Sequence, residues 1–317
     1  MANNRVLITG VSGFTGRYLV EYIREIDPDI PISGVDVQAP DNLYGCAFTR
    51  IDLQNYSEIS RVITEINPAY IFHLGGVNFS DQPQHFFDVN VVGTLNLLEA
   101  VRNAAEQIDP TILIVGSSAE YGMVNEDEHP VSEHNPLRPV SHYGVSKVAQ
   151  DLLGFQYFMS FGLKVIRVRP FNLIGPGQSA DYVCGSLVQQ FAEIEQGIRS
   201  PEILTGNQTP ERDFIDVRDL VKAYWMLMMK GTPGEVYNIG SGESASVRDV
   251  LQILLESTRM DITVTTDPGK ERQSDIPRMV SDITRITSQV GWTPTISLEV
   301  ALYDMLQHAR KTCLDSE

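Results

Sequence analysis

The sequence has few cysteines, few cations and no long apolar run. Its three cysteines, Cys46, Cys184 and Cys313, are odd in number, far apart and without nearby histidine, which predicts neither a disulfide framework nor a metal site. No stretch approaches the roughly twenty apolar residues that span a bilayer, and the N-terminus lacks the basic start and apolar run of a secretory signal. We therefore expect unpaired thiols, no metal, no membrane contact and a cytoplasmic location.

Positive charge is scarce, because 24 Lys and Arg residues face 41 Asp and Glu residues and the formal net charge is −17 at pH 7. Nucleic acids are bound through clustered lysine and arginine, so this composition argues against a nucleic-acid partner. An anionic ligand would have to be met by a few locally placed cations. The length of 317 residues allows a large core, in one long or two modest domains.

The first motif is a glycine-rich turn between a strand and a helix. The β-rich run Arg5–Thr9 leads into Gly10-Val11-Ser12-Gly13-Phe14-Thr15-Gly16, and a helical pattern continues to Ile26. Glycines there let the backbone approach a pyrophosphate, whose charge the helix N-terminus attracts. The spacing G-x-x-G-x-x-G departs from the general G-x-G-x-x-G fingerprint, so the segment is either a dinucleotide site or a simple turn.

An acidic residue at the end of the second strand favours the dinucleotide interpretation. The strand Ile32–Asp36 ends in a carboxylate twenty residues after Gly16. A carboxylate at that place accepts hydrogen bonds from the adenine ribose and repels a 2′-phosphate, and Val37 and Gln38 supply no compensating cation. We therefore expect NAD(H) in preference to NADP(H), unless Asp36 merely ends a strand.

Strands and helices then alternate along the chain. The run Phe48–Leu53 predicts a third strand, whose Asp52 either contacts adenine or caps a turn. Further elements are predicted at helix 56–66, strand 70–74, helix 85–107, strand 112–115, helix 143–160 and strand 164–168. This alternation predicts a doubly wound parallel sheet of the Rossmann type, with His73 as a satisfied core histidine and Gly75 close to the cofactor.

The alternation decays after Arg169-Pro170-Phe171-Asn172, where short helices and isolated strands follow. We interpret residues 1–171 as an NAD-binding domain and residues 172–317 as mainly a smaller, mixed substrate-binding lobe that partly returns to the first domain. The helices at 85–107 and 143–160 have extended apolar patterns. Ordinary core packing and a helix-pair surface both explain these patterns, and we expect a homodimer through the two helices.

The most informative stretch for chemistry contains Ser117, Tyr143 and Lys147. Ser117 follows the apolar run Ile112–Val115, which places its hydroxyl at the carboxyl end of a strand. Four residues separate Tyr143 from Lys147, so a helix would put the phenol and the ammonium on one face, roughly 6 Å apart along its axis. The cation and the helix N-terminus would lower the phenol pKa towards working pH. A tyrosine four residues before a lysine also occurs by chance.

Three arginines in the second half are candidates to hold a diphosphate. Arg212, Arg272 and Arg278 could each make bidentate, charge-assisted bonds to phosphate oxygens. Each could equally form a surface salt bridge.

Five motifs together suggest a family. They are Thr9-Gly10-x-x-Gly13-Phe14-x-Gly16, Gly116-Ser117-Ser118, Tyr143-x-x-x-Lys147, Arg169-Pro170-Phe171-Asn172 and Arg212-Asp213-Phe214-Ile215-x-Val217. Over essentially the whole chain, the sequence resembles the extended short-chain dehydrogenase/reductases that act on nucleotide sugars. Within that group the segments 116–122, 130–133, 143–147 and 171–178 look most like GDP-6-deoxy-D-mannose reductases, which reduce a 4-keto-6-deoxy sugar on GDP.

The resemblance implies a role for each matching residue. Tyr143 would donate a proton to the C4 oxygen of the sugar, Ser117 would hydrogen-bond the same oxygen, and Lys147 would hold the nicotinamide ribose and depress the pKa of the tyrosine. The residues implied to contact NAD(H) are Gly10, Gly13, Phe14, Thr15, Gly16, Asp36, Asp52, Leu53, Leu74, Gly75, Tyr143, Lys147 and Pro170. Those implied to contact the nucleotide sugar, with GDP favoured, are Ser118, Glu120, Asn172, Gln178, Arg212 and Arg272.

One departure from the family pattern concerns Ala119. Nucleotide-sugar 4,6-dehydratases carry a glutamate at this position, which takes the C5 proton during water elimination. Glu120 lies one residue further on, and neighbouring side chains of an extended chain point opposite ways, so it does not substitute. This favours a reductase over a dehydratase. Because Asp36 favours NAD(H), a 4-epimerase stays open, and so does an NAD-responsive binding protein without turnover.

Overall fold

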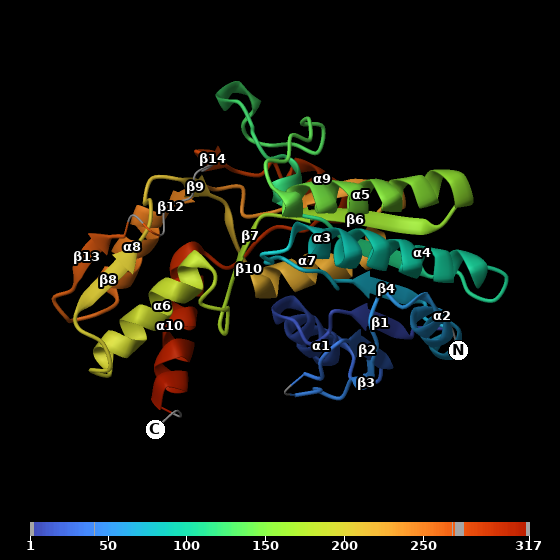
Figure 1. The fold of residues 1–317 in the computed structure, drawn as a ribbon, viewed down its shortest axis with the longest axis horizontal. Coiled ribbons are helices and arrows are strands. Elements are labelled where there is room, and N and C mark those ends of the chain that lie inside the picture. Colours follow the sequence, from blue (N-terminus) through green and yellow to red (C-terminus); the bar gives the residue numbers. More distant parts are fainter. Residues whose placement is uncertain (1–2, 41, 268, 270–275, 315–317) are drawn as a thin grey trace.

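The computed structural model describes residues 3–40, 42–267, 269 and 276–314, and its centre is a seven-stranded sheet (Figure 1). The strand order is β11-β6-β5-β4-β1-β2-β3, and all neighbouring pairs run parallel. Parallel neighbours need a crossover connection, which helices supply for most of the sheet. The expected doubly wound α/β fold is confirmed.

The sheet and its helices alternate along the first part of the chain and again near its end. The strands are β1 Val6–Thr9, β2 Ile32–Asp36, β3 Ala47–Arg50, β4 Tyr70–His73, β5 Thr111–Val115, β6 Lys164–Pro170 and β11 Val236–Ile239. The helices are α1 Phe14–Ile26, α2 Tyr56–Ile66, α3 Pro83–Phe86, α4 Gly93–Asn103, α5 His142–Phe161, α7 Val217–Lys230 and α9 Thr284–Val290.

Both faces of the sheet are covered by helices. Successive residues of a strand point to opposite faces, and β1 shows the consequence. Its Leu7 belongs to a buried cluster that includes side chains of α2, α4 and α5, whereas Ile8 belongs to a cluster with side chains of α1, α7 and α9. Because both faces are buried, the strands are apolar runs and do not alternate with polar residues.

The remaining elements build a smaller mixed lobe, which lies at the left of Figure 1. They are β7 Asn172–Ile174, α6 Val183–Glu195, β8 Glu202–Thr205, β9 Glu211–Arg212, β10 Phe214–Asp216, β12 Ala245–Ser246, α8 Val247–Glu256, β13 Thr263–Thr266, β14 Arg278–Met279 and α10 Leu298–Leu314. Helices α6, α8 and α10 share a separate hydrophobic core. The division at residue 171 falls between β6 and β7, and α7, β11 and α9 return to the first domain.

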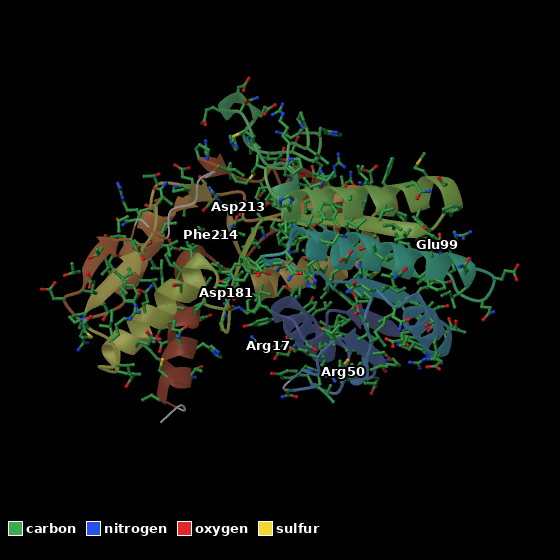
Figure 2. The ribbon with its side chains drawn as sticks, in the orientation of Figure 1. Arg17, Arg50, Glu99, Asp181, Asp213 and Phe214 are labelled. Atoms are coloured by element: carbon green, nitrogen blue, oxygen red, sulfur yellow. The ribbon has the colours of Figure 1, made fainter. Side chains whose placement is uncertain are left out.

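A buried carboxylate, Asp213, ties the lobe to the sheet domain (Figure 2). It accepts hydrogen bonds from the backbone N–H groups of Ser241 at 2.6 Å, Gly242 at 3.1 Å and Ser281 at 3.1 Å. Ser241 follows β11 of the large sheet, so one side chain fixes three segments that are far apart in sequence. Asp213 thereby holds the neighbouring Arg212 in place.

One predicted helix has a different form in the structure. The pattern at 85–107 predicts a continuous α-helix, but α3 and α4 are joined by a π-helical stretch, Phe87–Val92, and α4 ends at Asn103. The π-helical stretch contains the buried Asn90, whose amide Nδ2 donates to the Val77 oxygen at 3.1 Å and whose Oδ1 accepts from the Val77 N–H at 2.8 Å. Such stretches are common at functional sites.

Polar residues and thiols of the core follow the expectations. His73 is fully buried between the hydroxyls of Thr9 and Thr94, each 2.8 Å from a ring nitrogen, and burial lowers its pKa to about 3. It is a satisfied core histidine. The three cysteines are unpaired, with Cys46 and Cys184 buried. Across the described ranges, no helix combines the length and apolar character that crossing a membrane requires.

Candidate active site

The glycine-rich turn after β1 lies against the turn after β4 at the carboxyl edge of the sheet. Gly10 has a φ of +71°, and a Cβ on it would lie 2.7 Å from the Gly75 nitrogen. A Cβ on Gly16 would lie 2.5 Å from the Val11 oxygen. Only glycine fits these two positions, so backbone is left open at the N-terminus of α1, where N–H groups and the helix dipole attract a pyrophosphate. The segment Gly10, Gly13, Phe14, Thr15 and Gly16 therefore fits a dinucleotide.

Asp36 is held at the end of β2, beside this turn. Its carboxylate accepts from the Ser12 N–H at 3.0 Å and from the Val37 N–H at 2.7 Å. These bonds fix the carboxylate between the glycine-rich turn and the second strand, and its other lone pairs stay available to ribose hydroxyls. Arg50 of β3 is the register partner of Asp36. The sequence did not single out this cation.

The remaining residues expected at the cofactor lie along the same edge. Asp52 is exposed and accepts from the Gln54 N–H at 2.9 Å, which is the turn-capping alternative. Leu53 packs against Gly75, where an added Cβ would come within 2.6 Å of its Cδ1. Leu74 follows β4, and Pro170 ends β6. The structure thus brings these side chains to one edge, although Asp52 already has a partner.

Ser117 begins a short 3₁₀ turn, Ser118–Glu120, directly after β5. Its Oγ accepts from the Ala119 N–H at 3.1 Å, and its own N–H donates to Glu120 Oε1 at 2.8 Å. Because an oxygen lone pair is used by Ala119, the hydroxyl proton is left to be donated. Its hydroxyl makes a hydrogen bond with the Tyr143 phenol, which lowers the pKa of that phenol.

Tyr143 lies in the first turn of α5. Ser141 caps the N-terminus of this helix, because its Oγ accepts a hydrogen bond from the Gly144 N–H at 3.0 Å. The Tyr143 ring meets the edge of Phe86, with centroids 6.2 Å apart. Burial raises the phenol pKa above its ordinary value near 10, against the opposing effect of Ser117. The expected net lowering is therefore not found in this structure, and the phenol is protonated at neutral pH, as a proton donor must be.

Lys147 lies one turn further along α5, with Nζ 5.9 Å from the centroid of the Tyr143 ring. It is almost fully buried and donates to the Val115 oxygen at 2.9 Å and to Gln150 Oε1 at 2.8 Å. Burial lowers its pKa to about 8, and the Glu120 carboxylate opposes this shift. The predicted pairing of phenol and ammonium on one helix face is present.

Ser117, Tyr143 and Lys147 converge from two elements at the carboxyl end of the sheet. Two hydroxyls in mutual contact can bind one carbonyl oxygen of a substrate, and the protonated phenol can give that oxygen a proton. A bound nicotinamide would supply the hydride. The buried cation can stabilise negative charge on the phenol after the proton has left.

Asn90 is a further buried residue of the site that the sequence did not reveal. Its Nδ2 donates to Ser146 Oγ at 2.9 Å, and a Cβ on Gly76 would lie 2.9 Å from its Oδ1 and 3.4 Å from Lys147 Nζ. Asn90 therefore lies between the turn at Gly76, after β4, and the first turns of α5. A lone asparagine in an apolar helical pattern was the available signal.

Tyr182, at the start of α6, contacts the segment that follows β4. Asn78 Nδ2 donates to its hydroxyl at 3.0 Å, and the Phe79 ring meets its ring with centroids 5.1 Å apart. The Tyr182 phenol contributes to the raised pKa of Tyr143. The contacts join the turn after β4 to the lobe, across a separation of 104 residues.

Glu120 was expected to contact the nucleotide sugar, but it lies in the interior of the protein. It is fully buried, with Oε1 bound by the Ser117 N–H and Oε2 bound by Arg169 Nε at 2.8 Å. The alternation of an extended chain does not apply here, because residues 118–120 form a 3₁₀ turn. Ser118 lies partly buried in the same turn, and Ala119 carries no ionisable group.

The residues expected at the diphosphate lie where β7, β9 and β14 meet. The Asn172 N–H donates to the backbone oxygen of Asp213 at 3.0 Å, which brings Asn172 beside Arg212. Arg212 donates to the carbonyl of Ile276 at 2.7 Å, and Arg278 pairs with Glu211 at 3.3 Å. Arg212 and Arg278 therefore share the small sheet β12-β9-β14. Arg272 lies outside the described residues.

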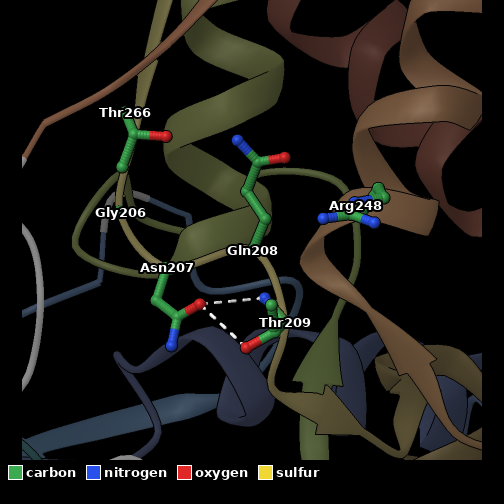
Figure 3. Close-up of a pocket in the computed structure, with 6 residues that line it drawn as sticks. All are labelled: Gly206, Asn207, Gln208, Thr209, Arg248 and Thr266. Carbon is green, nitrogen blue, oxygen red and sulfur yellow. Dashed lines mark hydrogen bonds between the residues drawn. The ribbon is translucent and has the colours of Figure 1, made fainter.

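Gln178 borders a different cavity, of about 390 Å³, between α1, α6 and α10. Its Nε2 donates to the Leu173 oxygen, and Arg17 and His308 line the same cavity. A second, polar pocket of about 210 Å³ lies in the lobe, with Arg248 and Asn207 in its wall (Figure 3). Neither pocket contains Ser117, Tyr143 or Lys147.

Known proteins resemble this chain over nearly its full length. A family model described as GDP-mannose 4,6 dehydratase matches residues 7–305. The GDP-6-deoxy-D-mannose reductase of Pseudomonas aeruginosa is 30% identical over 306 residues, which cover 95% of this chain and 96% of that protein.

Solved structures with bound cofactors have the same fold. RMD from Pseudomonas aeruginosa complexed with NADPH is similar with a TM-score of 0.85 and 29% identity, covering 98% of this chain and 99% of that one. UDP-glucose 4-epimerase of Thermus thermophilus in complex with NAD is similar with a TM-score of 0.84 and 27% identity, covering 96% and 99%.

These similarities agree with the site. The glycine-rich turn after β1 and Asp36 fit a nicotinamide dinucleotide. Ser117, Tyr143 and Lys147 fit a centre that reduces a carbonyl or oxidises an alcohol. The resemblance read from the motifs is confirmed, and the chain is an NAD(P)-dependent oxidoreductase of the extended short-chain type. It belongs to the GDP-mannose 4,6-dehydratase family.

Proposed function

We propose that the chain reduces the 4-keto group of a GDP-linked 4-keto-6-deoxy sugar with hydride from NADH. The observation that carries this proposal is that the turn with Ser117 and Ala119 packs against the start of α5 beside Tyr143, and that Ala119 offers no base: a Cβ on Gly144 would lie 2.7 Å from the Ala119 oxygen. Water elimination across C5 and C6 needs such a base, whereas carbonyl reduction needs a hydride and a proton donor. The similarity to a GDP-6-deoxy-D-mannose reductase supports the choice of substrate.

The residues of the chain perform the proton side of this reaction. Ser117 and Tyr143 hold the C4 oxygen, and the nicotinamide supplies hydride to C4 when it is bound. Tyr143 gives its proton to the oxygen as negative charge develops there. Lys147 then stabilises the phenolate, because its ammonium lies one helical turn away and the buried surroundings screen the attraction weakly.

A 4-epimerase is the second candidate, and Asp36 is the observation that favours it. An epimerase keeps NAD and returns the hydride to the same sugar, and Asp36 is placed to bind the ribose of NAD. The NAD complex of a similar UDP-glucose 4-epimerase agrees with this alternative. The two functions differ in whether reduced nicotinamide is consumed.

The test is to supply GDP-mannose and GDP-4-keto-6-deoxy-mannose separately, following nicotinamide absorbance and identifying products by NMR. We expect no dehydration of GDP-mannose, and NADH oxidation equal to the amount of keto sugar reduced. Interconversion of 4-epimers without net NADH oxidation would establish the epimerase instead. Formation of the keto sugar from GDP-mannose would show that a carboxylate elsewhere in the chain acts as the base that Ala119 cannot supply.

The proposed preference for NADH gives a quantitative prediction at Asp36. The 2′-phosphate of NADPH would lie against the fixed Asp36 carboxylate, and repulsion between the two negative charges would weaken its binding. The catalytic efficiency with NADH should therefore exceed that with NADPH by at least about tenfold. Asp36→Ala should narrow this ratio. Arg50→Ala is the control, since Arg50 is the cation in register with Asp36, and it should leave NADH kinetics unchanged. Preference for NADPH in the unmodified protein would contradict the ribose assignment.

We also propose a homodimer formed through α4 and α5. Leu95 on α4 is exposed, as are Leu152, Phe155 and Met159 on α5, although these side chains are large and apolar. The α5 residues recur at three, four and seven positions, which puts them on one face of the helix. A contiguous apolar face of this kind on a water-soluble domain is typical of a protein interface.

The homodimer predicts a change of mass on substitution. Met159, 64% exposed, should become buried between copies, so Met159→Asp should convert a dimer into a monomer in light scattering. Val300 on α10 is similarly apolar and 50% exposed, so Val300→Asp should leave the mass unchanged. A monomeric unmodified protein at micromolar concentration would refute the interface.

A further inference from the structure

A buried cluster of four charges lies directly behind the catalytic residues. Glu120 and Asp151 face Arg167 and Arg169, and all four residues are at most 7% exposed. Arg169 donates to Glu120 at 2.8 Å and to Asp151 at 2.8 Å, and Arg167 donates to Asp151 at 3.0 Å. Paired carboxylates and guanidiniums leave the cluster close to neutral, which is the condition for burying it.

Glu120 connects this cluster to the active site, and its position is tightly fixed. A Cβ on Gly116 would overlap Glu120 Oε1 and lie 3.0 Å from the Val168 oxygen. The carboxylate therefore lies directly on the Gly116 backbone. Because Glu120 is fully buried and bound by Arg169, it can make room for a larger residue at position 116 only by breaking these contacts. Glycine is required at position 116 by this side chain and not by the backbone conformation.

The first connection from Glu120 to the chemistry is through Ser117. The two residues cap each other: Glu120 accepts from the Ser117 N–H at 2.8 Å, and the Ser117 Oγ accepts from the Ala119 N–H at 3.1 Å. This reciprocal capping fixes the backbone and side chain of Ser117. The Ser117 hydroxyl then meets the Tyr143 phenol.

The second connection is electrostatic and reaches Lys147. Burial and the Asp151 carboxylate raise the pKa of Glu120, while Arg169 and the Ser117 N–H lower it. The Glu120 carboxylate in turn raises the pKa of Lys147, against the burial that lowers this pKa to about 8. A negative charge on Glu120 favours the ammonium form of Lys147.

Other charged groups face the same region. Arg169 contacts Glu120 directly, Asp151 shares Arg169 with it, and the Tyr121 hydroxyl accepts from Arg169 at 3.1 Å. Among the groups that perturb Lys147, however, Glu120 is the one whose charge opposes the effect of burial.

We propose that Glu120 is a positioning residue, which holds Ser117 in contact with Tyr143 and keeps Lys147 protonated during reduction. It is not a substrate contact and not a base. This inference rests on the proposed reductase function, because the orientation of Ser117 and the charge of Lys147 matter for proton transfer to the sugar.

The test is Glu120→Gln, which keeps the size and the acceptor oxygen but can never carry the charge. We expect kcat to fall by about tenfold to a hundredfold, the cost typical of a small misplacement, with KM unchanged. We expect the alkaline limb of the pH–kcat profile to move down by about one pH unit, because Lys147 loses a neighbouring negative charge. The pH dependence of NADH affinity should move in the same direction, which is a readout independent of the sugar.

Two further variants separate positioning from stability. Tyr121→Phe removes hydrogen bonds to Arg169 and Asn238 from the far side of the cluster, and should lower Tm without moving the pH profile. Gly116→Ala should displace the Glu120 carboxylate and reproduce the effect on kcat. The double variant Gly116→Ala, Glu120→Gln should have a kcat close to that of Glu120→Gln alone, because both substitutions act through the Glu120 carboxylate.

The outcomes distinguish this inference from the proposed function. If the unmodified protein does not reduce the keto sugar, the proposed function fails, and the NADH titration still tests Glu120. If the unmodified protein is active while Glu120→Gln keeps its kcat and its pH limb, Glu120 is not a positioning residue. If Glu120→Gln does not fold, Gly116→Ala provides the test. An unchanged kcat in Gly116→Ala would then overturn the inference.

Discussion

Tyr143→Phe should lower kcat by about 10²- to 10⁴-fold, the usual loss for a positioned general acid. The substitution removes one oxygen and keeps the ring, so the edge contact with Phe86 should persist. NADH affinity should change little, because the contacts that we propose for the cofactor lie mainly in the glycine-rich turn after β1 and at Asp36. Stopped-flow absorbance and equilibrium fluorescence would measure the two quantities separately.

A matched substitution on the same helix controls for effects on folding. Tyr157 lies further along α5, where its hydroxyl donates to Glu99 and not to the active site. Tyr157→Phe should keep kcat near that of the unmodified protein. If Tyr143→Phe also retained activity within a few-fold, the proton would have to come from Ser117 or Tyr182, and the assignment of Tyr143 would be abandoned.

The outline of the fold could be predicted because its signals are local. Apolar runs followed closely by glycine mark β1, β4 and β5, a run ending in an acid marks β2, and helix α2 begins and ends where its periodicity predicts. The lobe was less predictable, because its strands pair over long separations, as when β13 pairs with β8. The π-helical stretch at 87–92 was missed because one additional residue per turn leaves little trace in a hydrophobic pattern.

The site shows the same division between local and distant information. Ser117, Tyr143 and Lys147 could be identified from a strand end and a four-residue spacing. Tyr182 could not, because its contact with Asn78 depends on how the lobe meets the sheet. The environment of Glu120 was also hidden, since only the folded chain brings Arg169 to it. The pKa of Tyr143 had the opposite direction to the expectation, because burial in the folded chain raises it and outweighs the lowering effect of Ser117.

Lys147→Ala should impair cofactor binding and turnover together. Loss of a charged hydrogen-bond donor to the nicotinamide ribose should weaken NADH binding by about tenfold to a hundredfold. Loss of the cation beside the phenolate should lower kcat further, towards the effect of Tyr143→Phe. Lys222→Ala on α7 is the control, because that lysine pairs with Asp219 at 3.3 Å outside the site, and it should change neither quantity.

The pH profile of the unmodified protein tests the same lysine without a substitution. Burial disfavours the charged form, so Lys147 has a pKa of about 8 and loses its proton at a lower pH than an ordinary lysine. Reduction should therefore be fastest below pH 8 and decline as the pH rises through it. The phenol cannot cause this decline, because its own pKa is raised above 10. In Lys147→Arg the cation persists at every pH used, so the alkaline limb near pH 8 should disappear while some activity remains. A limb that stays at pH 8 in this variant would assign it to another group, and Glu120→Gln would then show whether that group is Glu120.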